Sequence, residues 1–277
     1  MSKLILVVLG IILAILIVSI ATIVIHISRR SIEEGVGETM AIHTVEGSYI
    51  LLPLPKIRSD VLSVEQALAY RRSIRSYEDK PITIEQLSQL LWATYGITQT
   101  RWGFKTTPSA GATYPLEIYV VIAPNGVVLE NGSLLTPGSY KYDPYTHSLK
   151  LVKKGDLRYD LYRAALNQEW VLKAPMNIVI CAVYERTTRI YGERGYRYVH
   201  MEVGHAGQNI YLEATALGLG TVAVGAFYDD KVHDVIGAKP DEHPLYIMPV
   251  GIPKQPYRVT EEEIHRFIEE NRRSIAR

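Results

Sequence analysis

Three arginines stand within five positions, Arg71, Arg72 and Arg75, in the stretch AYRRSIRSY of residues 69–77. Cations this close repel one another unless solvent or an anion separates them. One interpretation is a solvated helix end, in which the three side chains point into water. The other is an anion site, because a guanidinium group binds phosphate through two parallel hydrogen bonds. These nine residues alone do not choose between the two.

A second candidate site is the small-residue loop in TTPSAGATYPLEIYVV, residues 106–121. Ser109, Ala110 and their small neighbours let backbone approach a flat ligand closely, and Pro108 and Pro115 fix where the chain enters and leaves. The same composition is also typical of an ordinary turn. The loop therefore supports a ligand site only in combination with other residues.

Glu-x-x-His occurs twice, as Glu202 with His205 and as Glu262 with His265. Two such motifs on helices make half of a carboxylate di-iron site, and the other half comes from two glutamates on facing helices of a bundle. Several stretches of this chain have the pattern of buried strands instead of a bundle. The alternative is a carboxylate beside an imidazole one helical turn away, and we expect no metal site.

Other familiar chemistries lack support in the sequence. Gly218, Gly220 and Gly225 in GLGTVAVGA follow a helix pattern and have the wrong third spacing for a dinucleotide-binding loop, which must follow a strand. No Gly-x-Ser-x-Gly motif of a nucleophile elbow occurs. Cys181, the single cysteine, lies in the apolar run IVICAV and is expected to be a small core residue.

The charge balance excludes a chain that attracts nucleic acid through its overall field. Lys and Arg number 30 against 29 Asp and Glu, a net charge of +1. The chain has 19 tyrosines and only three phenylalanines. Because tyrosine has an apolar ring and a polar hydroxyl, we expect a core that contains many hydroxyl hydrogen bonds.

Helix and strand patterns are mixed without strict alternation, which favours an α+β fold. Capping boxes at SVEQ (63–66) and TIEQ (83–86) begin two helices. We predict helices over 63–72, 83–95, 156–174, 196–217 and 260–273. We predict strands over 115–124, 176–184 and 244–253, a hairpin over 138–152, and a short strand or strand-like loop over 221–227.

The N-terminal residues 1–27 are predicted to form a transmembrane anchor. Leu4 to Ile25 carries no charge, and about 20 apolar residues suffice to cross the hydrocarbon core of a bilayer. Residues 28–60 contain Pro53 and Pro55 and are predicted to be a linker, followed by a folded domain over 61–277. We expect a single-pass membrane protein with this domain in the cytoplasm.

The ordered set of motifs resembles the nitroreductase superfamily, and more closely the SagB-type dehydrogenases. The similarity rests on RRSIRSY, TPSAGATYPLEIYVV, YGERGYRYVHMEVGHAGQNIYLEATALGLGTVAVGAFYDD and MPVGIP, in that order between about residues 63 and 258. It implies a central mixed or antiparallel sheet flanked by helices, FMN as cofactor, and a homodimer with flavin at the subunit interface. NAD(P)H is the electron donor that reductases of this superfamily imply.

The resemblance also assigns roles to individual residues. Arg71, Ser73 and Arg75 match an Arg-x-Ser-x-Arg motif whose arginines contact the FMN phosphate and ribityl chain and whose serine contacts the pyrimidine edge. Pro108, Ser109 and Ala110 match a loop that reaches the flavin of the partner subunit. The remaining cofactor-binding residues that we expect are Arg72 beside this motif, Val224 and Gly225 beside the flavin ring, and Lys254 and Arg258 near the phosphate.

One departure from the SagB-type pattern concerns catalysis. Azoline-oxidising members have a Lys-Tyr pair where this chain has Ile190 and Tyr191. Isoleucine cannot act as a base, because a general base needs a titratable atom. Tyr191 is thus the predicted catalytic residue, and His200 and His205 are candidates to line the pocket. The predicted function is an FMN-dependent oxidoreductase of a small organic substrate; the alternative is a membrane-anchored flavin- or ligand-binding module without turnover.

Overall fold

The computed structural model describes residues 44–45 and 49–275 of the chain. Its central feature is an eight-stranded sheet in which every neighbouring pair is antiparallel. In spatial order its strands are β1 (Thr44–Val45), β2 (Tyr49–Leu51), β9 (Ser148–Lys154), β8 (Gly138–Asp143), β6 (Leu116–Ile122), β10 (Met176–Ala182), β12 (His243–Gly251) and β11 (Gly220–Thr221).

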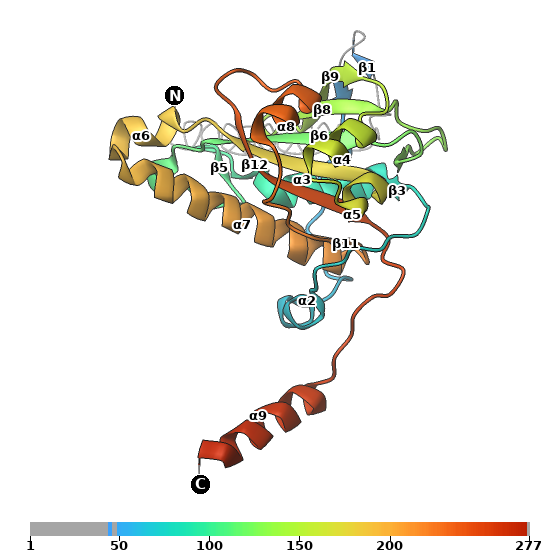
Figure 1. Ribbon diagram of the computed structural model, residues 1–277, viewed down its shortest axis with the longest axis vertical. Helices are drawn as coiled ribbons and strands as arrows, with labels where there is room; N and C mark the ends of the chain where they lie inside the picture. Colours follow the sequence, from blue (N-terminus) through green and yellow to red (C-terminus); the bar gives the residue numbers. More distant parts are fainter. Residues whose placement is uncertain (1–43, 46–48, 276–277) are drawn as a thin grey trace, which may run out of the picture. The chain divides into compact units, whose positions relative to one another are not determined.

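Helices lie on both faces of this sheet (Figure 1). The helices of the described residues are α2 (Val64–Tyr70), α3 (Ile84–Tyr95), α4 (Arg158–Ala164), α5 (Glu169–Lys173), α6 (Glu185–Tyr191), α7 (Arg194–Ala216), α8 (Asp229–Ile236) and α9 (Glu261–Ile275), with a 3₁₀ turn η1 (Ala110–Ala112). Helix α9 has no buried residues and does not cover the sheet. Two small sheets pair β3 (Ile82–Thr83) with β7 (Val127–Val128) and β4 (Ile97–Gln99) with β5 (Phe104–Lys105). The expected α+β class, with a central antiparallel sheet, is confirmed.

Strand alternation divides the core into two layers. On β6, Ile118 and Val120 face the cluster that includes α3 and α7, whereas Tyr119 and Val121 face the cluster that includes α4 and α8. The same alternation on β10 places Cys181 in the second cluster, fully buried, as expected for a small core residue. Because both faces of these strands are buried, the sheet holds the helices on either side at fixed positions.

The predicted boundaries hold where capping residues set them. Both capping boxes form at the starts of α2 and α3, and Thr260 begins α9 with a third, in which the Thr260 Oγ1 accepts from the Glu263 amide at 3.2 Å. The predicted helix over 156–174 is instead two helices. Leu166 and Asn167 adopt positive φ angles of 56° and 59° between α4 and α5, which interrupts the helix.

Three further differences concern segments with weak patterns. The predicted linker over 28–60 includes strands β1 and β2, because β2 pairs with the otherwise open edge of β9. Helices α6 and α8 were not predicted, and the segment 221–227 contributes only Thr221 to a strand. The predicted anchor over 1–27 lies outside the described residues and stays a prediction. Within the described part of the chain, none of the helices is long and apolar enough to cross a bilayer.

A buried charge network stabilises the second core layer. The Glu242 carboxylate is 1% exposed, accepts a hydrogen bond from the Tyr119 hydroxyl, and lies 2.5 Å from Lys141 Nζ. Lys141 also lies 2.9 Å from Glu117. We expect Glu242→Ala to lower the free energy of unfolding by about 1–3 kcal/mol, because the buried Tyr119 hydroxyl loses its hydrogen-bond partner, whereas Lys141 keeps Glu117.

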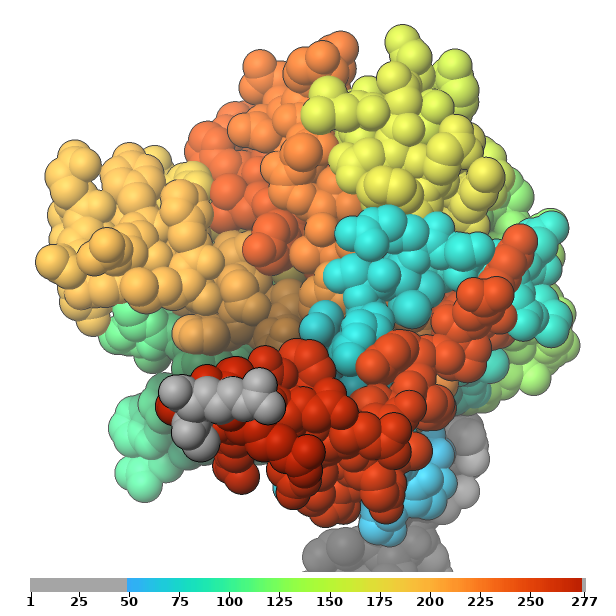
Figure 2. Space-filling view, turned by 60° about the horizontal axis from the view of Figure 1, so that its bottom comes forward, coloured from blue at the N-terminus to red at the C-terminus, as the bar shows by residue number. Residues whose placement is uncertain are grey.

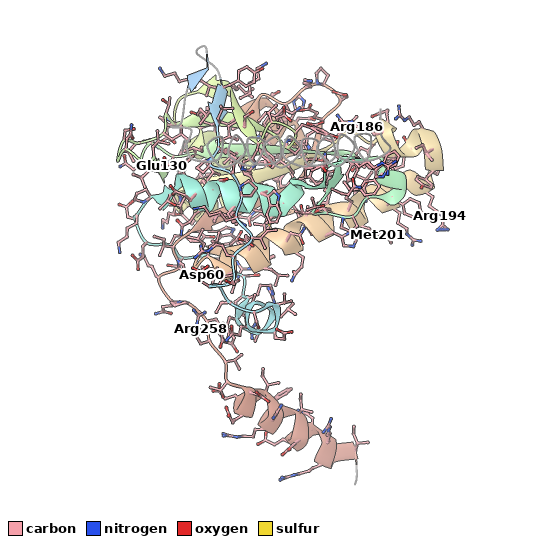
Figure 3. The ribbon with its side chains drawn as sticks, turned by 180° about the vertical axis from the view of Figure 1, so that it is seen from behind. Asp60, Glu130, Arg186, Arg194, Met201 and Arg258 are labelled. Carbon is pink, nitrogen blue, oxygen red and sulfur yellow. The ribbon has the colours of Figure 1, made fainter. Side chains whose placement is uncertain are left out.

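Urea denaturation measures this loss, and Glu130→Ala is the matched control, because Glu130 is exposed (Figure 3). A Glu242→Ala protein as stable as the control would show that the network contributes little to folding.

Candidate flavin site

Residues 71–77 form an extended segment and not the end of a helix. Helix α2 ends at Tyr70, and Arg71 is its C-cap with φ −56° and ψ 126°. The next residues run beside β11: Ser73 forms a parallel bridge with Thr221, and the Ile74 amide donates to the Thr221 carbonyl at 2.9 Å. The helix expected through Arg72 is therefore two residues shorter at its C-terminal end, because β11 provides backbone partners in place of further helical hydrogen bonds.

Alternation along this segment puts Arg71, Ser73 and Arg75 on one side, here called the arginine face. The Arg71 guanidinium lies 5.1 Å from the centre of the Tyr211 ring, and that of Arg75 lies 5.3 Å from the Trp170 ring. The Ser73 Oγ is 3.0 Å from the Tyr211 hydroxyl. Three residues predicted from the motif are thus brought together, with two aromatic rings beside them.

Arg72 points to the opposite side. Its guanidinium lies 3.7 Å from the centre of the Tyr257 ring, and it lines a separate cavity of about 290 Å³ together with Lys254 and Arg258. None of the residues of the arginine face lines this cavity. Arg72 lies apart from the arginine face because neighbouring residues of an extended segment project to opposite sides. The expected roles of Arg72, Lys254 and Arg258 at the phosphate stay a prediction.

The arginine face carries polar groups without partners among the described residues. None of the salt bridges in this part of the chain involves Arg71 or Arg75. Two buried atoms beside it, Thr221 Oγ1 and Trp170 Nε1, have no hydrogen-bond partner there. An unsatisfied buried polar atom costs about 1–3 kcal/mol. A polar, anionic ligand at this face would satisfy these groups.

The segment after β11 contributes exposed backbone. Gly225 is exposed, and a Cβ added to it would meet nothing closer than an atom of Tyr246 at 3.7 Å. Val224, in contrast, is 3% exposed and packs in the second core cluster, and its amide donates to the Ile247 carbonyl at 2.9 Å. The Val224 side chain therefore points into the core, and its expected place beside a flavin ring stays a prediction.

These parts surround a hollow on one face of the molecule (Figure 2). The cyan segment that includes the arginine face, the gold helix α7 and the orange segment after β11 border it. Tyr211 of α7 contacts both of the other parts. Its hydroxyl accepts a hydrogen bond from the Ala223 amide, after β11, at 2.8 Å and lies beside Ser73 of the arginine face.

The small-residue loop Pro108–Ala112 is held from beneath by a buried carboxylate. The Ser109 Oγ accepts from the Tyr114 amide at 2.9 Å, and Ser109 also hydrogen-bonds Glu202 on α7. Glu202 is 3% exposed and accepts from the Tyr95 hydroxyl at 2.7 Å. Burial raises the pKa of Glu202, although its hydrogen bonds with Ser109 and Tyr95 oppose that shift.

Tyr191 lies against this loop. Gly111 has a φ of 58°, and a Cβ there would stand 2.5 Å from the Tyr191 hydroxyl. The predicted catalytic tyrosine and the small-residue loop are thus neighbours. His200 shares a hydrogen bond of 2.8 Å with the Tyr184 hydroxyl. His205 is exposed whereas Glu202 is buried, so this Glu-x-x-His pair does not converge on one point.

The small-residue loop and the arginine face contact the same helix. Thr107, just before the loop, accepts a hydrogen bond from the Asn209 Nδ2 of α7 at 3.1 Å, and the Ser73 Oγ lies 3.0 Å from the Tyr211 hydroxyl. From Thr107 the loop extends towards Tyr191, which lies against Gly111.

The sequence analysis missed three residues of this site. Tyr211 and Thr221 lie within the stretch that carries the resemblance, but no role was assigned to them, and Trp170 lies in a segment without a motif. The general excess of tyrosine was the only composition signal for Tyr211.

The raised pKa of the buried Glu202 makes the stability of the protein depend on pH. Because its pKa is raised, folding favours the protonated form, and the stability that this form provides is lost as the pH rises through the folded pKa. We expect Glu202→Gln to raise the thermal midpoint at pH 7.5 and to leave it unchanged near pH 4. Melting curves at both pH values check this, and equal midpoints at pH 7.5 would contradict it.

Comparison with known proteins agrees with this geometry. A model of the "Nitroreductase family" matches residues 68–252, which include both the arginine face and the small-residue loop. The MJ1384 protein of Methanocaldococcus jannaschii, named as a nitroreductase, is 49% identical over 205 residues, 74% of this chain and 98% of that protein.

Two further similarities point the same way. The crystal structure of a Ralstonia eutropha JMP134 protein named as a nitroreductase superposes with a TM-score of 0.65 at 27% identity, covering 78% of this chain and 93% of that one. The microcin B17-processing protein McbC of Escherichia coli is 30% identical over 128 residues, 45% of each chain. The family match covers more than half of the chain, and the fold agrees with it: the protein belongs to the nitroreductase family.

Proposed function

We propose that the protein is an FMN-dependent oxidoreductase that works as a homodimer. The observation that carries the proposal is the arginine face, where two guanidinium groups without a carboxylate partner among the described residues flank Ser73, next to the orphaned Thr221 Oγ1. Membership of the nitroreductase family supports the same cofactor. FMN has an anionic phosphate and a ring with polar edges, and both kinds of group have counterparts here.

When bound, FMN would supply the hydride-accepting and hydride-donating chemistry of the reaction. Arg71 and Arg75 would bind its anionic part through charge-assisted hydrogen bonds. Ser73 and the exposed Gly225 amide would orient the polar ring edge, and Tyr211 would fix Ser73. Pro108, Ser109 and Ala110 would close the site from a second chain, and their small side chains would allow close approach to a flat ring.

The homodimer is the assembly that the similarity to the nitroreductase superfamily implies. On the side of α7 opposite its core residues, Met201 is 53% exposed (Figure 3). A second chain packed there would bury this side chain. A two-fold axis gives both sites the same composition.

Tyr191 is the residue that we propose to donate or accept a proton at the substrate. It is 36% exposed beside the loop, so a substrate can reach its hydroxyl. Its neighbour Ile190, 57% exposed, has no titratable atom. A reaction that needs a lysine base next to this tyrosine is therefore not proposed, and NAD(P)H is the proposed electron donor of a reductase reaction.

Purification of the full chain tests the proposed function. We expect a yellow protein that releases FMN on denaturation. Anaerobic addition of NADH or NADPH should remove the flavin absorption band at about 450 nm, which is a property of the cofactor. A small electron acceptor should then restore the band. A protein that binds FMN but is reduced by dithionite and not by NADH or NADPH would contradict NAD(P)H as the electron donor. A protein that remains colourless after addition of FMN would contradict the cofactor.

A further inference from the structure

A second cavity of about 550 Å³ lies at the other end of the small-residue loop from the arginine face. It opens between the turn of the β8–β9 hairpin, β6 and the start of α6, where Arg186 stands (Figure 3). Its volume is in the range of pockets that bind small organic molecules, about 300–1,000 Å³. None of the residues of the arginine face lines it. The side chains that carry the inference are Tyr95, Lys105, Tyr114, Glu117, Tyr145 and Arg186.

Three tyrosine rings surround the Lys105 ammonium. Its Nζ lies 4.0 Å from the centre of the Tyr95 ring, 4.9 Å from that of Tyr114 and 5.5 Å from that of Tyr145. Two of the rings are held in place: Tyr95 and Tyr114 meet edge to face at 6.0 Å, and the Tyr114 hydroxyl accepts from the Lys105 amide at 3.2 Å. Tyr145 is 69% exposed. The Tyr145 amide donates to Asp143 Oδ1 at 2.9 Å. The cage is thus formed before any ligand binds.

Three other charged residues that line the cavity are paired with one another. Glu117 forms salt bridges with Lys141, at 2.9 Å, and with Arg186. None of the salt bridges among the described residues involves Lys105. Burial lowers the pKa of Lys105 to about 8, although Glu117 opposes the shift. A nearby anion would therefore stabilise the charged form of the half-buried Lys105.

We propose that this cavity binds a small aromatic carboxylate. The carboxylate would pair with the Lys105 ammonium, and the ring would lie among Tyr95, Tyr114 and Tyr145, where edge-to-face and offset-stacked contacts are available. A single negative charge fits better than a dianion, because Lys141 and Arg186 already share Glu117. The cavity has room for a molecule of one or two rings.

The test uses the full chain and 2-naphthoate as the probe, with 2-naphthamide as its neutral analogue. Isothermal calorimetry compares the wild type with Lys105→Met and Lys105→Arg. We expect Lys105→Met to weaken 2-naphthoate binding about tenfold or more, the loss of one charge-assisted hydrogen bond, and Lys105→Arg to retain most of it. The affinity for 2-naphthamide should be weak and equal in all three proteins.

Lys231→Met is the matched control, because Lys231 also lies over a tyrosine ring, Tyr228 at 4.3 Å, but outside the cavity. Reductive methylation followed by peptide mass spectrometry locates the probe: 2-naphthoate should protect Lys105 and not Lys231. No binding, equal affinity in Lys105→Met and the control, or binding without protection of Lys105 would each overturn the proposal. These outcomes do not depend on whether the chain holds FMN.

Discussion

Arg71→Ala combined with Arg75→Ala is expected to give a folded protein that does not retain FMN. The two guanidinium groups share one face with Ser73, and neither has a carboxylate partner among the described residues. Each charge-assisted hydrogen bond contributes about 1.5–3 kcal/mol, so the pair should weaken FMN binding by roughly a hundredfold or more. Flavin content after gel filtration and fluorescence titration with FMN measure the loss.

Arg72→Ala is the matched control for this double variant, since it removes the same charge one residue away, on the opposite side of the segment. Circular dichroism should show the same helix content for all variants. If Arg72→Ala loses FMN and the double variant retains it, the phosphate lies in the cavity of Lys254 and Arg258, and the assignment of the arginine face is wrong.

The second large effect is complementation between two inactive variants. A chain with Ala110→Trp has an intact arginine face but a blocked loop, and a chain with Arg71→Ala and Arg75→Ala has the reverse. If each site takes its arginines from one chain and its loop from the other, neither homodimer binds FMN. A mixed dimer has one intact site and one doubly altered site, so it should bind about one FMN for two chains.

Co-expression with two different affinity tags isolates the mixed dimer for flavin quantification. A mixed dimer without FMN, together with homodimers of Ala110→Trp that do bind FMN, would show that one chain builds its site alone. A wild-type chain that sediments as a monomer with bound flavin would contradict the shared site directly.

The parts of the fold that the sequence predicted are those with strong local patterns. The capping residues Ser63, Thr83 and Thr260 begin helices where expected. On α7, the side chains of Val199, Val203 and Ala206 face the hydrophobic core, as their spacing predicts. These features depend on neighbours three or four positions apart, so a single sequence contains the information. The interruption between α4 and α5 depends on positive φ angles at Leu166 and Asn167. Neither position is a glycine, so the sequence does not indicate this backbone conformation.

The site was predicted as a set of residues and not as a geometry. The spacing of Arg71, Ser73 and Arg75 by two indicates one face only if the segment is extended, and the capping box upstream suggested a helix instead. The bridge between Ser73 and Thr221 holds the segment in the extended conformation. It joins residues almost 150 positions apart, so the local sequence does not predict it. The bridge between Val224 and Ile247 likewise joins residues that are not neighbours in the sequence.

The most direct test of the central claim is a crystal structure of the full chain grown with FMN. We predict electron density for FMN with its anionic groups on Arg71 and Arg75 of one chain, its polar ring edge near Ser73 and Gly225, and Ser109 of a second chain close to the ring. FMN bound elsewhere, or an empty arginine face in crystals that contain FMN, would contradict this account.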